Sequence, residues 1–218
     1  MNSEKATKAF QQFEEIGIIP VVVLNDAKDA LPLGKALMEG GLPAAEVTFR
    51  TAAAEESIRI MSENFPDMLV GAGTVLTIDQ VDRAVAAGAK FIVAPGLDEE
   101  IVKYCLEKDI PVCPGIQSPT ELTKAVKLGL DHVKFFPAEN SGGLKMINAM
   151  GAAFPAVKFM PTGGISASNV VDYLKSKKIF CCGGSWMVKG DMIAAGDFDK
   201  IKDLVAEAAG IVKQVKAE

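Results

Sequence analysis

Eight short apolar runs alternate with helical patterns along the whole chain, and this alternation constrains the fold more than any other feature. The runs occupy residues 18–24, 44–50, 68–74, 91–96, 111–115, 132–137, 158–164 and 179–185. Successive runs start 20 to 26 residues apart, which suits a strand, a short loop and a helix of about three turns. Runs that are apolar on both faces predict parallel strands covered by helices, and eight such units close into a (β/α)8 TIM barrel.

Helix boundaries between these runs follow known capping patterns. Ser118, Pro119 and Glu121 predict a helix start with a capping box and with proline at the first helical position, and Gly129 predicts its end. The segment that begins at Thr77, with Gln80 three residues later and Gly88 at its end, repeats this plan.

An open doubly wound sheet is the alternative α/β fold. It would favour a glycine-rich turn after the first strand, and the segment "VVVLNDAKDA" contains none. An amphipathic stretch before the first strand, with Ala6, Phe10 and Phe13 on one face, predicts an extra N-terminal helix that covers the bottom of the barrel. Because no linker or shift of composition divides the chain, we expect residues 1–218 to form a single barrel domain.

Composition excludes several kinds of partner. The net charge is −5 and no basic cluster occurs, so a nucleic-acid partner is not expected. The N-terminus lacks a signal-peptide pattern, and the apolar run of residues 16–24 is interrupted by Gly17 and Pro20 and is too short to span a membrane. The four cysteines show no CxxC spacing, which favours reduced residues in a cytoplasmic protein.

Histidine is nearly absent from this sequence. His132 is the single histidine, so a metal site built from two or three histidines is excluded, and we expect neither a metal nor an organic cofactor. His132 lies at the start of a predicted strand, where we interpret it as structural.

Charged side chains occur on two predicted strands, although ionised groups are costly to bury unless they are paired. Side chains alternate along a strand, so Glu46, Thr48 and Arg50 share one face, and Lys134 shares a face with Phe136. The alternating residues on the opposite face of each strand are apolar and suited to packing against the helices. We therefore predict that these polar groups point into the barrel. Two structural interpretations remain: a buried ion pair, or a lysine whose amine reaches solvent.

The functional interpretation is a nucleophilic lysine with a carboxylate that moves protons. Burial and the cation of Arg50 would favour the neutral amine of Lys134, whereas the carboxylate of Glu46 would favour the ammonium. A neutral amine can attack a carbonyl carbon and form a Schiff base.

Two diglycines follow the last two predicted strands. They are Gly163–Gly164 in "PTGG" and Gly183–Gly184, before Ser185, in "CGGS". Paired glycines let a ligand approach the backbone, and these two loops of a barrel often bind phosphate. We therefore predict a phosphate site, with "TGGIS" leading directly into a helix that opens at Ser166 and adds its N-terminus.

Several motifs together make the chain resemble a known family from end to end. The motifs are "EVTFRT" (46–51), "GAGTV" (71–75), "APG" (94–96), "PGI" (114–116), "KFFPAE" (134–139), "PTGGI" (161–165) and "GGSW" (183–186). In this order they resemble the 2-keto-3-deoxy-6-phosphogluconate (KDPG) aldolases, many of which also act on 4-hydroxy-2-oxoglutarate (KHG). Phe49, where leucine is common, and the pair Cys181–Cys182 are minor departures.

The resemblance implies a homotrimeric class I aldolase that cleaves KDPG, a 2-keto acid, to pyruvate and glyceraldehyde 3-phosphate. It implies that Lys134 forms the Schiff base and that Glu46 is the general acid and base. Residues implied to bind substrate are Arg50 and Thr74 for the carboxylate, Pro95 and Phe136 along the pocket, and Thr162, Gly163, Gly164, Gly184 and Ser185 around the distal hydroxyl and the phosphate.

Two other classes remain open on the residues alone. A phosphate-binding isomerase or epimerase would use Glu46 as a base and Lys134 as an electrostatic group, without a covalent step. An inert or engineered barrel scaffold would need none of these residues. The sequence leaves open whether a gluconate or a galactonate epimer is preferred, and how strongly the reaction depends on phosphate.

Overall fold

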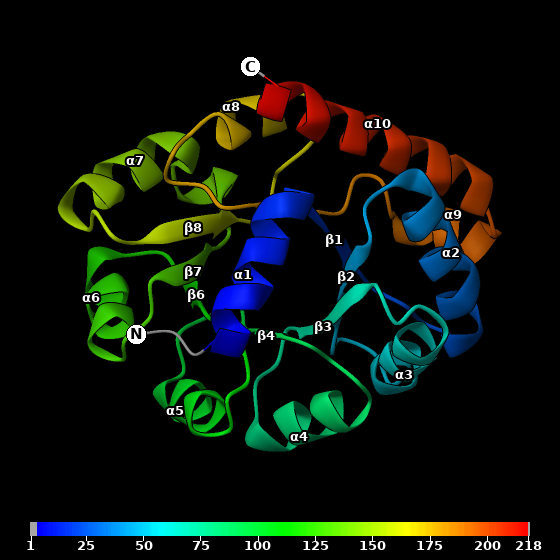
Figure 1. Ribbon diagram of the computed structural model, residues 1–218, viewed down its shortest axis with the longest axis horizontal. Coiled ribbons are helices and arrows are strands. Elements are labelled where there is room, and N and C mark those ends of the chain that lie inside the picture. Colours follow the sequence, from blue (N-terminus) through cyan, green and yellow to red (C-terminus); the bar gives the residue numbers. More distant parts are fainter. Residues whose placement is uncertain (1–3, 218) are drawn as a thin grey trace.

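Parallel strands form the centre of the molecule, and the computed structural model describes residues 4–217 of it. The strands are β1 (Ile18–Val22), β2 (Ala44–Thr48), β3 (Leu69–Gly73), β4 (Ile92–Val93), β5 (Val112–Cys113), β6 (Gly115–Ile116), β7 (His132–Phe135), β8 (Lys158–Pro161) and β9 (Cys182–Gly184). Within the described residues they form one sheet in the order β5-β4-β3-β2-β1-β9 and another in the order β6-β7-β8. Figure 1 shows both sheets curling around one central space.

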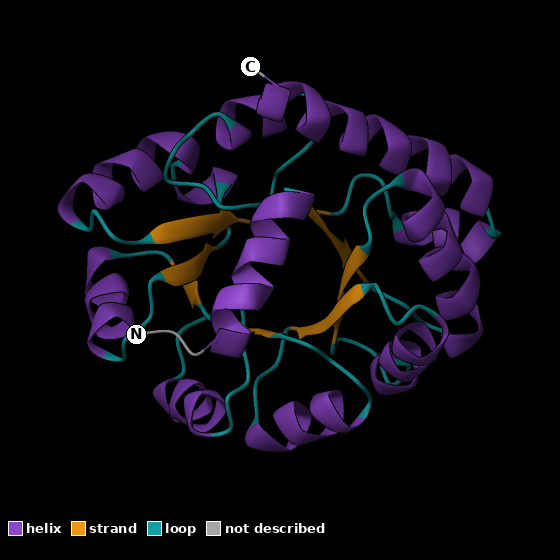
Figure 2. Cartoon of the chain, in the orientation of Figure 1, coloured by secondary structure: helices purple, strands orange, loops and turns teal. Residues whose placement is uncertain are grey.

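Helices cover the strands, the first lying across one end of them and the others surrounding them on the outside, as Figure 2 shows. They are α1 (Glu4–Ile16), α2 (Ala30–Gly40), α3 (Ala54–Asn64), α4 (Ile78–Ala86), α5 (Glu99–Glu107), α6 (Pro119–Lys127), α7 (Gly143–Ala153), α8 (Val170–Leu174), α9 (Gly190–Ala195) and α10 (Phe198–Ala217), with short 3-10 helices η1 (Ala27–Asp29) and η2 (Glu139–Ser141). In residues 4–217, none of these helices has the length and apolarity that a membrane span requires.

The α/β class and the parallel strands are confirmed, and each of the eight apolar runs contains a strand. The fifth run is split into β5 and β6 at Pro114, because proline has no N–H to donate to a neighbouring strand. Beyond the sheets, single bridges pair Phe159 with Ile179 and Thr162 with Gly183.

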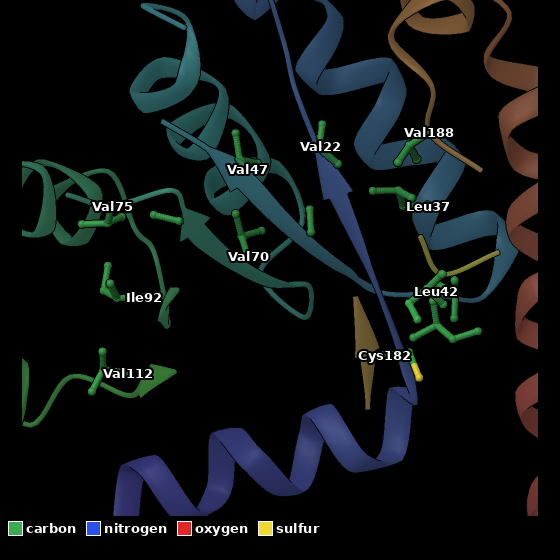
Figure 3. Close-up of a cluster of buried hydrophobic side chains, with 14 of the residues drawn as sticks. Val22, Leu37, Leu42, Val47, Val70, Val75, Ile92, Val112, Cys182 and Val188 are labelled. Atoms are coloured by element: carbon green, nitrogen blue, oxygen red, sulfur yellow. The ribbon is translucent and has the colours of Figure 1, made fainter. Parts of the chain in front are cut away.

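The main hydrophobic core lies between the outer face of the sheets and the helices. Figure 3 shows part of it, including Val22, Val47, Val70 and Ile92, which are fully buried. Ala45 and Val47 of β2 belong to this outer core, as the alternation of strand side chains predicts.

Helix α1 crosses one end of the central space, where the strands begin (Figure 1). Its Phe13 ring lies 4.6 Å from that of Phe91, and its Phe10 ring stacks on His132 at 4.3 Å. The His132 ring also lies 2.6 Å from the carboxylate of Asp131. The predicted N-terminal helix is therefore present, and its aromatic face covers this end of the strands.

Both predicted helix starts are confirmed, with one difference in detail. Ser118 and Glu121 form the complete capping box at α6. At α4 the hydroxyl of Thr77 accepts the N–H of Gln80, but the Gln80 side chain accepts the N–H of Leu76, one residue before the cap.

Candidate active site

Lys134 and Glu46 meet inside the curled sheet. The Nζ of Lys134, on β7, lies 3.1 Å from Oε1 of Glu46, on β2. The exposed fractions of the two side chains are 5% and 1%, so the alternative of a lysine that reaches solvent is wrong. The Lys134 Nζ also lies 5.4 Å from the centre of the Phe136 ring, which shares its face.

The Glu46 carboxylate is only half satisfied. Its Oε2 is buried and has no hydrogen-bond partner among the described residues, whereas buried carboxylate oxygens are normally bonded. Gly73 of β3 provides the space for this side chain, since a Cβ there would lie 2.3 Å from Oε1. This role of Gly73 does not follow from the strand pattern, although Gly73 is part of the "GAGTV" motif.

Arg50 does not point into the interior beside Lys134 as the strand alternation predicted. Strand β2 ends at Thr48, because the N–H of Arg50 turns back to the Thr48 carbonyl at 2.8 Å. Arg50 is therefore exposed, and its Nε donates to Oγ1 of Thr74 at 3.2 Å. Thr74 has φ +54°, a left-handed conformation that is uncommon for a residue other than glycine.

A cavity of about 450 Å³ opens at the carboxyl ends of the strands. The predicted site residues among its lining are Arg50, Phe136, Thr162, Gly163, Gly164, Gly184 and Ser185. Val21 also lines it and pairs with Glu46 in the β1–β2 register, which places Glu46 at the level of the cavity wall. Lys189 is a further cation in this lining that sequence analysis missed.

Pro95 is not part of the lining of this cavity. It lines a separate hollow of about 250 Å³ together with Val75 and Leu97. Its backbone carbonyl instead approaches Gly115, where an added Cβ would lie only 2.1 Å from the Pro95 oxygen. The pocket role that the resemblance implies for Pro95 stays a prediction.

The first diglycine presents unpaired backbone donors. Gly163 and Gly164 have φ of +97° and +81°, and a Cβ on Gly164 would lie 2.5 Å from the Glu139 side chain behind the turn. The N–H groups of Gly164 and Ser185 donate to no backbone carbonyl in the described part of the chain, and Gly163 lies beside them next to the bridge between Thr162 and Gly183. Clustered free N–H groups of this kind form an anion-binding concavity.

The second diglycine, Gly183–Gly184, is small for a reason other than the ligand space that the sequence predicts. A Cβ on Gly183 would lie 2.3 Å from Oγ1 of Thr162, and a Cβ on Gly184 would lie 2.1 Å from the ring of Trp186. These glycines make room for neighbouring side chains. The Thr162 Oγ1 that fills this space is itself buried and has no hydrogen-bond partner among residues 4–217.

The helix expected at Ser166 does not form there. The N–H of Ser166 bonds to the side chain of Asn169 at 2.9 Å, and α8 begins only at Val170 and has five residues. Because the turn at Asn169 already satisfies Ser166, the anion site rests on the loop N–H groups and lacks a helix N-terminus.

The cysteines do not supply an alternative nucleophile. Burial raises the pKa of the Cys105 thiol to about 12, and burial likewise raises the pKa of Cys113 and of Cys182. The thiolate is the reactive form, so these thiols are inert near neutral pH. Lys134 is therefore the buried group that can act as a nucleophile, and its contact with Glu46 provides an acid–base partner.

Comparison with known proteins matches most of the chain to one family. The family model for the KDPG and KHG aldolases matches residues 10–204. A 2-dehydro-3-deoxy-phosphogluconate aldolase of Treponema pallidum is 45% identical over 203 residues, which cover 93% of this chain and 97% of that protein.

Solved structures agree with the sequence comparison. A KDPG aldolase from Legionella pneumophila, with pyruvate captured as a covalent carbinolamine intermediate, superposes with a TM-score of 0.87 at 39% identity, covering 94% of this chain and 97% of that one. The Zymomonas mobilis aldolase with 3-phosphoglycerate gives the same TM-score and identity, with 94% and 95% covered.

Proposed function

The chain belongs to the KDPG and KHG aldolase family, and we propose that Lys134 and Glu46 carry out its chemistry. It is a class I aldolase, a carbon–carbon lyase that cleaves KDPG to pyruvate and glyceraldehyde 3-phosphate through a Schiff base. The observation that carries the residue assignment is the buried contact of 3.1 Å between Lys134 and a half-satisfied Glu46.

The first step is attack of the Lys134 amine on the C2 carbonyl of the substrate. Glu46 is placed to take a proton from Nζ, which leaves the neutral amine that the attack requires. The amine adds to C2 as a carbinolamine, and Glu46 returns its proton to the C2 hydroxyl, which leaves as water and gives the protonated imine.

The second step breaks the bond between C3 and C4. Glu46 takes the proton of the C4 hydroxyl, directly or through a water, and the electrons of the C3–C4 bond move into the iminium. Glyceraldehyde 3-phosphate departs, and Glu46 returns a proton to C3 of the enamine. Hydrolysis of the imine then frees pyruvate and Lys134.

The two ends of the substrate fit two different groups of donors. We assign the carboxylate to Arg50, which lines the cavity, and to Thr74, which is joined to Arg50 by a 3.2 Å hydrogen bond. We assign the phosphate to the first diglycine, Gly163–Gly164, with the free N–H groups of Gly164 and Ser185, and Phe136 packs along the chain between the two ends.

The family assignment also supports proposals on the closure of the barrel, the oligomeric state, the cellular location and a second activity. We infer that the two sheets are one closed (β/α)8 barrel, because β5 and β6 are separated only by Pro114 and a bridge joins Thr162 to Gly183. We propose a homotrimer, in which a neighbouring subunit covers exposed Leu76, which is 57% exposed. The free buried cysteines favour the cytoplasm, and cleavage of KHG is proposed as a second activity.

Borohydride trapping with pyruvate tests the residue assignment. Wild-type protein should gain one reduced pyruvate by intact mass, and peptide mapping should place the adduct on Lys134. Lys134→Arg should gain none and should lose cleavage, because a guanidinium stays protonated. Lys90→Arg is the control, since the Lys90 amine is bound to the carbonyls of Pro66 and Met68. An adduct on Lys134→Arg would refute the assignment.

A further inference from the structure

Lys189 is an exposed cation at the active-site cavity, and no carboxylate of the described residues pairs with it. It lines the cavity together with Gly164 and Ser185, and its side chain makes no hydrogen bond or ion pair within residues 4–217, although its carbonyl accepts the N–H of Ile193. The nearest carboxylate in sequence is that of Asp191, whose Oδ1 accepts the N–H of Met192 at 2.9 Å.

The chain geometry holds Lys189 beside the unpaired backbone donors. After β9, the N–H of Val188 turns back to the carbonyl of Ser185 at 3.1 Å, so the residue that follows stays near the end of this strand. The lining of the cavity contains no acidic side chain, and Arg50 is its other cation. The Glu139 carboxylate behind Gly164 accepts the hydroxyl hydrogen of Tyr173.

Lys189 and Arg50 provide positive charge at different ends of the cavity. Arg50 follows β2 and Lys189 follows β9, and β1 lies between these strands, so the strands that lead to the two residues are two strand spacings apart, roughly 10 Å. The Arg50 side chain bonds to Thr74, beyond β3, which is the side away from β9. An anion bound at the first diglycine would therefore be contacted by the ammonium group of Lys189 rather than by Arg50.

The structure gives the Lys189 side chain no role in holding the fold. Lys189 is the N-cap residue of α9, but its side chain makes no capping hydrogen bond. Its neighbour Gly190 has open space around the position of a Cβ. Substitution of the lysine side chain therefore removes charge from the cavity without removing a packing or capping contact.

We propose that Lys189 binds the substrate phosphate and sets the preference of the enzyme for phosphorylated over unphosphorylated 2-keto acids. The inference rests on the proposed function. The neutral N–H groups fix the position of the anion, whereas the ammonium group adds an attraction whose strength depends on the charge of the anion. The loop donors alone would accept a phosphate but would discriminate less strongly by charge.

The test compares kcat/KM for KDPG with that for unphosphorylated 2-keto-3-deoxygluconate. In Lys189→Gln the ratio of the two values should fall about tenfold, mainly through KM for KDPG, as loss of a charge-assisted hydrogen bond predicts. Lys189→Glu should lower the ratio further, and Lys189→Arg should preserve most of it. Lys213→Gln, on the exposed face of α10, is the control and should leave the ratio unchanged.

Ionic strength provides a second measurement. Raising the salt concentration should lower the wild-type ratio, because an exposed cation is screened, and should affect the Lys189→Gln ratio less. An unchanged ratio in Lys189→Gln, or an equal fall in Lys189→Arg, would overturn the proposal. Pyruvate trapping in wild-type protein involves no phosphate, so its failure would refute the proposed function separately.

Discussion

Replacing Gly73 with alanine should disable the active site without changing any residue that carries the chemistry. The new Cβ would lie 2.3 Å from Oε1 of Glu46 and 2.6 Å from its Cγ, closer than heavy atoms can approach. Glu46 must therefore move, and its 3.1 Å contact with Lys134 is the interaction that it gives up.

The expected loss follows from the role assigned to Glu46. A positioned acid–base group contributes about 10²- to 10⁴-fold, so kcat for pyruvate release should fall by at least about 10²-fold. Overpacking should also cost about 1–3 kcal/mol of unfolding free energy, which urea titration would measure. Gly71→Ala is the matched control two residues earlier, because its Cβ would meet the Phe91 ring at 2.4 Å and lower stability while kcat of the folded protein is kept.

A double-mutant cycle with Glu46→Gln decides whether Gly73 acts through Glu46. If it does, Gly73→Ala combined with Glu46→Gln should be no slower than Glu46→Gln alone, because the same proton transfer is lost only once. If the two losses multiply in the double variant, Gly73 affects catalysis by another route and the reasoning from this contact is wrong.

Two further predictions concern stability. Phe13→Ala should lower the unfolding free energy by about 3–5 kcal/mol in urea titration, because its ring is 1% exposed and packs on Phe91; a loss below about 1 kcal/mol would contradict the covering role of α1. Burial alone would raise the pKa of Glu121, but hydrogen bonds from Gln117 and Ser118 outweigh it and lower that pKa. Wild-type stability relative to Glu121→Ala should therefore be greatest above the unfolded pKa of about 4.3 and should disappear as the pH falls through the lower folded value.

The repeating pattern of the sequence was sufficient to predict the parallel α/β fold. Each apolar run became a strand because its residues had partners on both faces, and local signals such as the Ser118 capping box do not depend on distant contacts. The pairing of Lys134 with Glu46 was also predictable, since both lie on strand faces whose other neighbours are apolar.

Other features depended on contacts between distant segments, which a strand pattern does not contain. Arg50 left the strand face because its N–H turned back to Thr48, and Ser166 found a partner in Asn169 before a helix could begin. Gly183 and Gly184 line the cavity as predicted, but a Cβ on either would also meet Thr162 or Trp186, a packing reason that the strand pattern does not contain. For Arg50 and Ser166, a local hydrogen bond took the place of the predicted arrangement.

The contact between Lys134 and Glu46 could also be interpreted as a structural ion pair, and the unsatisfied oxygen argues against that. Burying two charges costs several kcal/mol each, and a structural pair offsets this cost only when its remaining hydrogen-bonding groups are satisfied. Here Oε2 of Glu46 and Oγ1 of Thr162 are both buried without partners in the described chain, and Thr162 lines the cavity. Such a site is costly for stability alone, whereas a substrate that brings a carbonyl and hydroxyl groups can supply the missing partners. Glu46→Leu combined with Lys134→Met should therefore abolish cleavage and leave the protein at least as stable as wild type.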